Sequence, residues 1–280
     1  TPANGGTEIV PAGTTYTWSA PVIAPAGSIT GGSAQATGQT SISQTLTNTT
    51  SAPATATYTV TPRSGTCNGS SFTVTVTVNP TPVLNSGLTP ADVCSNTTFT
   101  YNPTSLTTGT TFSWTRLGAA GITTTEPATG TDGISQVLRN FTSETIPVTY
   151  EYLLTANGCT NTRQVVVNIK PEPVIADQSA SVCSGEALTH HILLDNFDNP
   201  DDNVTFTWPA PELSGGLTGG SARTVPSSAD MTGTFVNTSG LAGTATYTVT
   251  PSYDGCAGDP KIIIVTVGSQ PVLGNLDRFA

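Results

Sequence analysis

The chain has few charged residues and very few basic ones. Asp, Glu, Lys and Arg make up 9% of the 280 residues, and Lys and Arg together number only 8. A nucleic-acid partner or an anionic membrane surface is bound by clustered basic side chains, which are missing here under a formal net charge of −10. Long solvated helices also need many charged residues on their outer faces. The sequence therefore excludes nucleic-acid partners and argues against helical structure.

Long apolar runs are missing as well. The longest uninterrupted run extends from Ile262 to Val265, whereas a membrane-spanning helix needs about 18 or more apolar residues. The core of a signal peptide is longer than this run too. We therefore expect no direct membrane insertion by these residues, and we expect any targeting segment to lie outside them.

Thr, Gly, Pro, Ser and Ala dominate what remains, with 28 Gly and 21 Pro. Thr and Val are β-branched and fit a pleated surface, while Gly and Pro supply the turns that many short strands require. The fold class predicted from this composition is all-β.

Four features recur along the chain at one spacing, which indicates tandem repeats. An aromatic-x-Trp motif ends at Trp18, Trp114 and Trp208, and the Trp residues are 96 and 94 residues apart. A Tyr stands nine residues before a Cys, an Asn stands ten residues before that Tyr, and a Pro-Val pair closes each unit. The Tyr residues are Tyr58, Tyr150 and Tyr247.

These features divide the chain into repeats at residues 1–81, 82–172 and 173–270, with residues 271–280 expected to begin a fourth. Repeats 2 and 3 each have an early Cys before their Trp, at Cys94 and Cys183. Repeat 1 has none, so we expect it to be truncated at its N-terminus, with its early Cys upstream of Thr1. Both ends are then expected to be cuts through a longer array.

Within a repeat, apolar and polar residues alternate with period two, as in the segment from Phe72 to Val78. Six to eight such strands with turns between them describe a β-sandwich of the immunoglobulin kind. We expect the three Trp and the three register Tyr residues to lie in the cores of their repeats.

Four runs carry a resemblance to a known family: TTYTW at Thr14 to Trp18, TYTVTP at Thr57 to Pro62, CSGE at Cys183 to Glu186, and VTVNP at Val76 to Pro80. Over its whole length the chain resembles the PKD-like repeats of very large bacterial surface proteins. The resemblance implies a gliding adhesin of the Bacteroidota type, secreted by the type IX route, in which such repeats form an extended stalk or adhesive filament.

The five cysteines are expected to form disulfides, because a small secreted domain buries little apolar surface. The favoured pairs lie within repeats, Cys94 with Cys159 and Cys183 with Cys256, which leaves Cys67 unpaired by truncation. The alternative is a staple across each repeat boundary, Cys67 with Cys94 and Cys159 with Cys183. No Cys-x-x-Cys spacing is present, so a zinc site is not expected.

One acidic segment is a candidate cation site. Asp195, Asp198, Asp201 and Asp202 stand close together between two strands of repeat 3. Carboxylates at this spacing can supply the oxygen ligands that Ca²⁺ prefers, although the pattern is not that of an EF-hand. The alternative is a solvated acidic turn. No other cofactor is expected.

Catalysis is not expected from this sequence. The only histidines, His190 and His191, are neighbours in a strand-like segment and should point to opposite faces. Asn48, Asn140 and Asn237 each begin an N-glycosylation acceptor pattern, but an Asn at a strand end is also ordinary turn chemistry.

The sequence thus favours a structural function over an enzymatic one. Rigid sandwiches joined by Pro-containing linkers would form the stalk of a long cell-surface adhesin, with neighbouring repeats as partners and an extracellular surface or glycan bound by other regions. The alternative is a sandwich module that binds a glycan or protein through its loops. Ice binding by rows of Thr is disfavoured, because sandwich strands twist.

Overall fold

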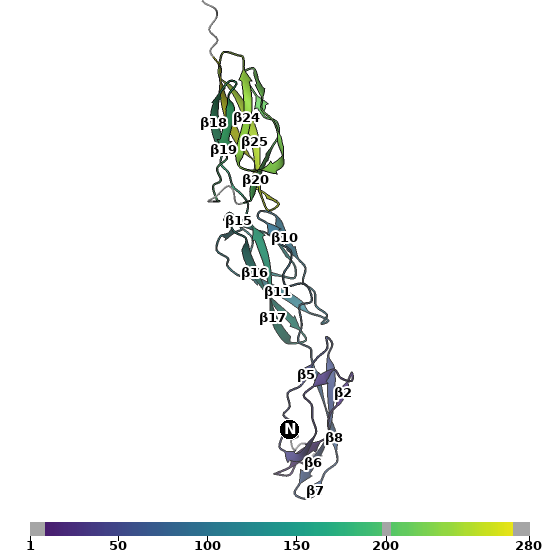
Figure 1. Ribbon diagram of the computed structural model, residues 1–280. Helices are drawn as coiled ribbons and strands as arrows, with labels where there is room; N and C mark the ends of the chain where they lie inside the picture. Colours follow the sequence, from purple (N-terminus) through teal and green to yellow (C-terminus); the bar gives the residue numbers. More distant parts are fainter. Residues whose placement is uncertain (1–8, 198–202, 271–280) are drawn as a thin grey trace, which may run out of the picture.

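The computed structural model describes residues 9–197 and 203–270, and all of their regular secondary structure is β-strand. The strands form three successive β-sandwiches that lie end to end in an elongated array (Figure 1). No helix in the described residues is long and apolar enough to cross a membrane. The prediction of a tandem all-β fold is confirmed.

The described part of repeat 1, residues 9–81, contains eight strands, most of them in one sheet. That sheet has the order β2-β6-β1-β4, with β7 and β8 also paired to β6, and β3 pairs separately with β5. The strands are β1 (Thr15–Trp18), β2 (Val22–Ala24), β3 (Ile29–Thr30), β4 (Gln35–Gln39), β5 (Thr47–Asn48), β6 (Ala54–Ser64), β7 (Cys67–Asn68) and β8 (Phe72–Val78).

Repeat 2 builds its main sheet in the order β13-β11-β16-β17-β9, and two short pairs, β10-β14 and β12-β15, cover it. All pairings are antiparallel except that of β9 with β17, which is parallel. The strands are β9 (Val93–Cys94), β10 (Thr98–Tyr101), β11 (Thr111–Arg116), β12 (Ile122–Thr123), β13 (Thr129–Thr131), β14 (Ile134–Val137), β15 (Arg139–Asn140), β16 (Ile146–Ala156) and β17 (Cys159–Lys170).

Repeat 3 repeats this plan in a more regular form. Its main sheet has the order β18-β27-β25-β20-β23, β21 and β26 pair with β25, and the second sheet is β19-β24-β22. The strands are β18 (Gln178–Cys183), β19 (Ala187–His191), β20 (Val204–Trp208), β21 (Glu212–Leu213), β22 (Leu217–Gly219), β23 (Arg223–Ser227), β24 (Asp230–Asn237), β25 (Gly243–Tyr253), β26 (Cys256–Ala257) and β27 (Lys261–Gly268).

The longest strands follow the period-two pattern of the sequence. In β25, buried residues alternate with partly buried or exposed ones along most of the strand, so one face packs on the core and the other faces solvent. Strand β16 behaves in the same way. The alternation of Val, Tyr and Ala with Thr therefore determines both that these segments form strands and which face of each strand is buried.

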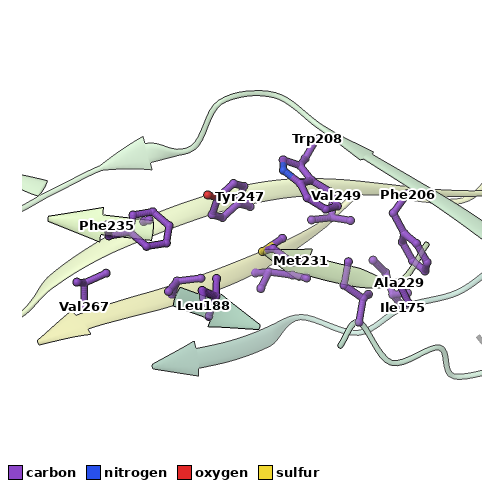
Figure 2. Close-up of a cluster of buried hydrophobic side chains, with 14 of the residues drawn as sticks. Ile175, Leu188, Phe206, Trp208, Ala229, Met231, Phe235, Tyr247, Val249 and Val267 are labelled. Carbon is purple, nitrogen blue, oxygen red and sulfur yellow. The ribbon is translucent and has the colours of Figure 1, made fainter. Parts of the chain in front are cut away.

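Each repeat has its own hydrophobic core, as expected for sandwiches that fold as separate units. Trp208 and Tyr247 meet edge to face in the core of repeat 3, with ring centroids 6.1 Å apart (Figure 2). The indole N–H of Trp208 donates to the carbonyl of Ser221 at 3.1 Å. Trp114 and Tyr150 form the same kind of pair in repeat 2 at 5.6 Å, and Trp18 and Tyr58 are buried in repeat 1.

Burial also raises the pKa of the register tyrosines. The pKa of Tyr150 is raised to about 12, chiefly by desolvation. Its hydroxyl donates to Gln136 Oε1 at 2.8 Å, and Tyr58 donates to Gln44 Oε1 at 2.7 Å in repeat 1. A buried hydroxyl thus keeps a hydrogen-bond partner in both repeats.

Repeat 1 has an open face where the other repeats are closed. Strand β17 pairs with β9 and strand β27 pairs with β18, but β8 pairs only with β6 among the described strands. Val76 is 37% exposed, whereas its counterparts Val167 and Val265 are 0% exposed. A groove of about 440 Å³ lies over this face and is lined by Tyr16, Tyr58, Phe72 and their neighbours.

Candidate functional site: the junctions between repeats

Each repeat has two different ends, and the cysteines lie at these ends. The late Cys directly follows the turn of the long hairpin: Cys159 pairs with Ala156 across it, and Cys256 pairs with Tyr253. The early Cys ends the first strand, where Cys94 pairs with Lys170 at the end of the closing strand. We call these the hairpin end and the closing end of a repeat.

The hairpin turns explain why the late Cys stands at the tip. Asn157 and Gly158 both have positive φ angles, 51° and 78°, and so do Asp254 and Gly255, at 45° and 82°. Two consecutive residues of this kind form the tight turn that Asn-Gly and Asp-Gly sequences favour between antiparallel strands. The next residue, the Cys, is therefore held at the extremity of the sandwich.

The length of the closing strand separates the two cysteines of one repeat. Strand β17 begins at Cys159 and ends at Lys170, the residue beside Cys94. At about 3.3 Å per residue, the two ends lie about 36 Å apart. Disulfide geometry requires Cα atoms within about 7 Å. A bond between Cys94 and Cys159 is thus impossible in this fold.

The structure instead links two repeats through Cys94 and Cys256, whose Cα atoms are 5.4 Å apart. The favoured pairs, Cys94 with Cys159 and Cys183 with Cys256, were therefore wrong. The boundary staple of Cys67 with Cys94 was wrong too, because Cys94 lies at the end of repeat 2 that faces repeat 3. Cys67, Cys159 and Cys183 are free cysteines, so the alternative pair of Cys159 with Cys183 is not formed either.

Polar contacts surround the disulfide at the junction between repeats 2 and 3. The ammonium of Lys170 lies 2.6 Å from the Asp254 carboxylate, and this hydrogen bond raises the pKa of Lys170. The side chain of Asn196 donates to the carbonyls of Phe141 at 3.1 Å and Glu172 at 2.8 Å. Repeat 3 is thus tied to both the body of repeat 2 and the linker.

The junction between repeats 1 and 2 uses the same positions. Asn79 directly follows β8 and corresponds in position to Lys170 at the end of β17. The side chain of Asn79 donates to the carbonyl of Asn157 at 2.7 Å. Asn157 is the counterpart of Asp254 in the hairpin turn. In addition, Asn161 donates to the carbonyl of Pro82 in the linker at 2.8 Å. The closing end of one repeat therefore meets the hairpin end of the next at both junctions.

The asparagines that stand ten residues before the register tyrosines stabilise the closing ends of repeats 2 and 3 by hydrogen bonds. The amide of Asn140 donates to the carbonyls of Glu144 and Ile169, at 2.7 and 2.8 Å, and its oxygen accepts from the backbone N–H of Thr142 at 3.0 Å. Asn237 makes the equivalent bonds to Leu241 and Val267. Asn140 is 0% exposed, so its side chain serves to stabilise the fold and is not accessible as a glycan acceptor.

The candidate metal and catalytic residues do not form a site in the described part of the chain. Asp198, Asp201 and Asp202 lie outside the described residues, and Asp195 uses its backbone N–H to donate to the carbonyl of Val174 at 2.8 Å. Within residues 9–197 and 203–270, no group of His, Cys, Asp and Glu is arranged to hold a metal ion. Calcium binding by this segment stays a prediction.

The two histidines point to opposite faces of β19 and have different partners. His190 is partly buried and lies 3.2 Å from Gln178 Oε1, while the ring of His191 lies 2.8 Å from the Asp230 carboxylate. Desolvation, and then the neighbouring His191, lower the pKa of His190. Neither histidine is near a Ser or Cys nucleophile in these contacts.

Sequence reasoning missed several residues that build the junction. Ser95 follows the early Cys, and its hydroxyl accepts from the N–H of Asn140 at 2.9 Å and donates to Glu172 at 3.2 Å. Asn196 lies in the acidic segment, where only the Asp residues were named as candidate ligands. The available signals were the Cys-Ser pair that recurs at Cys183 and the Gly that precedes Cys159 and Cys256.

Comparisons with known proteins support the fold. A family model described as "PKD-like domain" matches residues 4–82, 91–173 and 180–271. The comparison with curated proteins gives no match.

Among solved structures, titin domains I67–I69 share 10% identity over 93% of this chain and 89% of that chain, with a TM-score of 0.38. Three N-terminal domains of the outer capsid protein Hoc of bacteriophage RB49 share 13% identity over 96% of this chain and 92% of that chain, with a TM-score of 0.35.

A third similar structure, the endo-fucoidan hydrolase MfFcnA4, shares 13% identity with a TM-score of 0.28. The match covers 91% of this chain but only 39% of that chain. Likenesses this distant have no bearing on function, and immunoglobulin-like repeats are typically non-catalytic. Because the family match extends over three tandem copies and most of the sequence, the chain belongs to the PKD-like domain family.

Proposed function

We propose that this chain is a stretch of stalk in a long, secreted cell-surface adhesin, and that it has no catalytic role. The repeats at 1–81, 82–172 and 173–270 would act as rigid spacers that project an adhesive region away from the cell. This proposal includes the Bacteroidota gliding-adhesin type and type IX secretion, which the sequence resemblance implies.

The observation that carries the proposal is the docking of consecutive repeats. Repeats 2 and 3 are joined by the linker from Pro171 to Pro173 and also by the Cys94–Cys256 disulfide. Two connections between the same pair of repeats restrict bending and twisting more than a single flexible linker does. A surface that only had to bind a ligand would not need its domains held in line.

The disulfide also supports an extracellular location. Disulfides persist in oxidising compartments and are rare in reducing cytosol. The low charge and abundant Thr fit the same setting, in which small sandwiches gain stability from a covalent bond as well as from their cores.

Small-angle X-ray scattering in solution tests the spacer role. Each repeat is about as long as its longest hairpin strand, because β6, β16 and β25 have 11 residues each and 11 residues at 3.3 Å per residue extend about 36 Å. Three repeats in line should therefore give a particle about 110 Å long, with a radius of gyration of about 32 Å. A compact 280-residue protein has a radius of gyration of about 19 Å. A value near the compact one would refute the proposal.

A second candidate function is glycan or protein binding by the open groove of repeat 1. The groove is lined by Tyr16, Tyr58 and Phe72, and aromatic rings of this kind stack on ligands. Against it, these rings occupy core positions, and in the described residues Phe141 is the one aromatic side chain that is exposed. Isothermal titration with oligosaccharides, comparing the native chain with a Phe72→Ala variant, distinguishes the two functions.

A further inference from the structure

The closing end of repeat 3 is built like the closing end of repeat 2. Ser184 accepts from the N–H of Asn237 at 2.9 Å, as Ser95 does from Asn140. The N–H of Ser184 donates to the carbonyl of Gly268 at 3.0 Å, and that of Ser95 donates to Lys170 at the same distance. The backbone around the early Cys therefore has one conformation in both repeats.

The same correspondence holds for the turn that follows. The N–H of Asn96 donates to the carbonyl of Leu138, and the N–H of Gly185 donates to that of Phe235, both at 2.8 Å. Both residues have positive φ, 60° at Asn96 and 83° at Gly185. Each early Cys is thus held at the edge of a closing end by the same network of bonds.

The two closing ends differ in what covers them. Cys94 is bonded to Cys256 in the hairpin end of repeat 3, whereas Cys183 is exposed and free. We propose that the closing end of repeat 3 is a docking site for the hairpin end of repeat 1 of a second copy of the chain, and that Cys183 forms a disulfide with Cys67 of that copy.

The other end of the molecule offers a suitable partner. Strand β7, which begins at Cys67, lies at the tip of repeat 1 that points away from repeat 2 (Figure 1). Cys67 pairs with Ser64 across a hairpin turn, as Cys256 pairs with Tyr253, and it too is exposed and free. Repeat 1 of a second copy of the chain therefore carries the hairpin end that the site should accept.

Formation of the disulfide between Cys183 and Cys67 requires an oxidant, and a small disulfide can serve as one. The thiols of Cys183 and Cys67 lose two electrons and two protons as the sulfur–sulfur bond forms, and a small disulfide such as oxidised glutathione takes them up and becomes two thiols. Because the two ends are different surfaces, the contact is head-to-tail and continues as an open chain rather than closing into a dimer.

One feature of the known junction is not reproduced at this site. Gly268 stands where repeat 2 has Lys170, and Gly65 stands where repeat 3 has Asp254. The Lys170–Asp254 ion pair therefore has no counterpart. The site should depend on the disulfide and backbone fit, so its occupation should be insensitive to salt.

The test uses the full 280-residue chain with Cys159→Ser as background, so that Cys67 and Cys183 are the two free thiols. Two variants are made in this background, Cys67→Ser and Cys183→Ser. Each is incubated in a buffer of reduced and oxidised glutathione, alone and mixed with the other, and cross-linked species are mapped by non-reducing peptide analysis.

We expect the mixture to form a Cys67–Cys183 dimer at least several-fold faster than either variant forms a symmetric dimer. The parent with both thiols should form a ladder of longer species. Equal cross-linking in the mixture and in the single variants would overturn the proposal, because random collision of exposed thiols gives that result. Absence of any Cys67–Cys183 product would overturn it as well.

Two control measurements accompany the cross-linking experiment. The Cys94–Cys256 peptide must be present in every variant, which shows that the known junction has formed. The proposal rests on the repeat organisation and not on the stalk function. In the Cys159→Ser background, a variant with both Cys67→Ser and Cys183→Ser has no free thiol, so scattering from it measures the shape of the chain without end-to-end cross-linking.

Discussion

The Cys256→Ser substitution should lower the stability of repeat 3 strongly. With repeat 2 folded, Cys94 is fixed beside Lys170, and the disulfide closes a loop of 86 residues between Lys170 and Cys256. In the chain-entropy model, a loop of this length stabilises the folded repeat by about 4.5 kcal/mol. For a domain of this size, each kcal/mol changes the melting temperature by about 4–8 °C.

Differential scanning calorimetry should therefore show one transition of Cys256→Ser shifted downward by on the order of 20 °C. The matched control is Cys183→Ser, which makes the same substitution in the same repeat at an exposed, free cysteine. Its melting profile should overlay that of the native chain, and a reductant added to the native chain should reproduce the Cys256→Ser profile. If both serine variants melt together within a few degrees, the disulfide does not stabilise the repeat.

Three further perturbations test the interior of the repeats. Asn237→Ala should cost about 2–3 kcal/mol in urea unfolding, because it leaves buried carbonyls without donors, whereas Asn48→Ala in the more open repeat 1 should cost less. Val167→Thr should destabilise by about 1–3 kcal/mol because it buries a hydroxyl, while Val76→Thr at the exposed counterpart should be nearly neutral. The pKa of Tyr150 is raised to about 12 in the folded chain, so its contribution to stability is complete below pH 10 and is lost as the pH rises to about 12; Tyr150→Phe should flatten that alkaline decline, and a decline unchanged in this variant would contradict the assignment.

The fold could be predicted from sequence because its signals are local. Period-two alternation, as in the segment from Phe72 to Val78, predicts a strand and its buried face directly. The recurring Trp and Tyr gave the number of repeats and their core positions. The role of Asn140 was harder to foresee, because the four hydrogen bonds of its side chain join it to a turn and a strand end that meet only in the folded sandwich.

The disulfide could not be predicted from cysteine spacing because the spacing does not say which end of a sandwich each cysteine occupies. The Asn-Gly and Asp-Gly turns before Cys159 and Cys256 place these residues at hairpin tips. The closing strand then runs away from the tip for its full length. Combining these two facts would have excluded pairs within a repeat, but the parallel pairing of Cys94 beside Lys170 is a tertiary feature with no sequence signal.

The position of the disulfide also predicts that the two junctions differ in how easily they bend. A peptide linker by itself is a single connection about which two rigid bodies swivel. At the junction of repeats 2 and 3, the chain leaves β17 at Lys170, while the disulfide joins Cys94 on the neighbouring strand to the hairpin of β25 and β26. The main sheets of the two repeats are therefore joined covalently through adjacent strands. Bending at this junction must distort a sheet or break a bond, whereas at the junction of repeats 1 and 2 it need only break hydrogen bonds from Asn79 and Asn161.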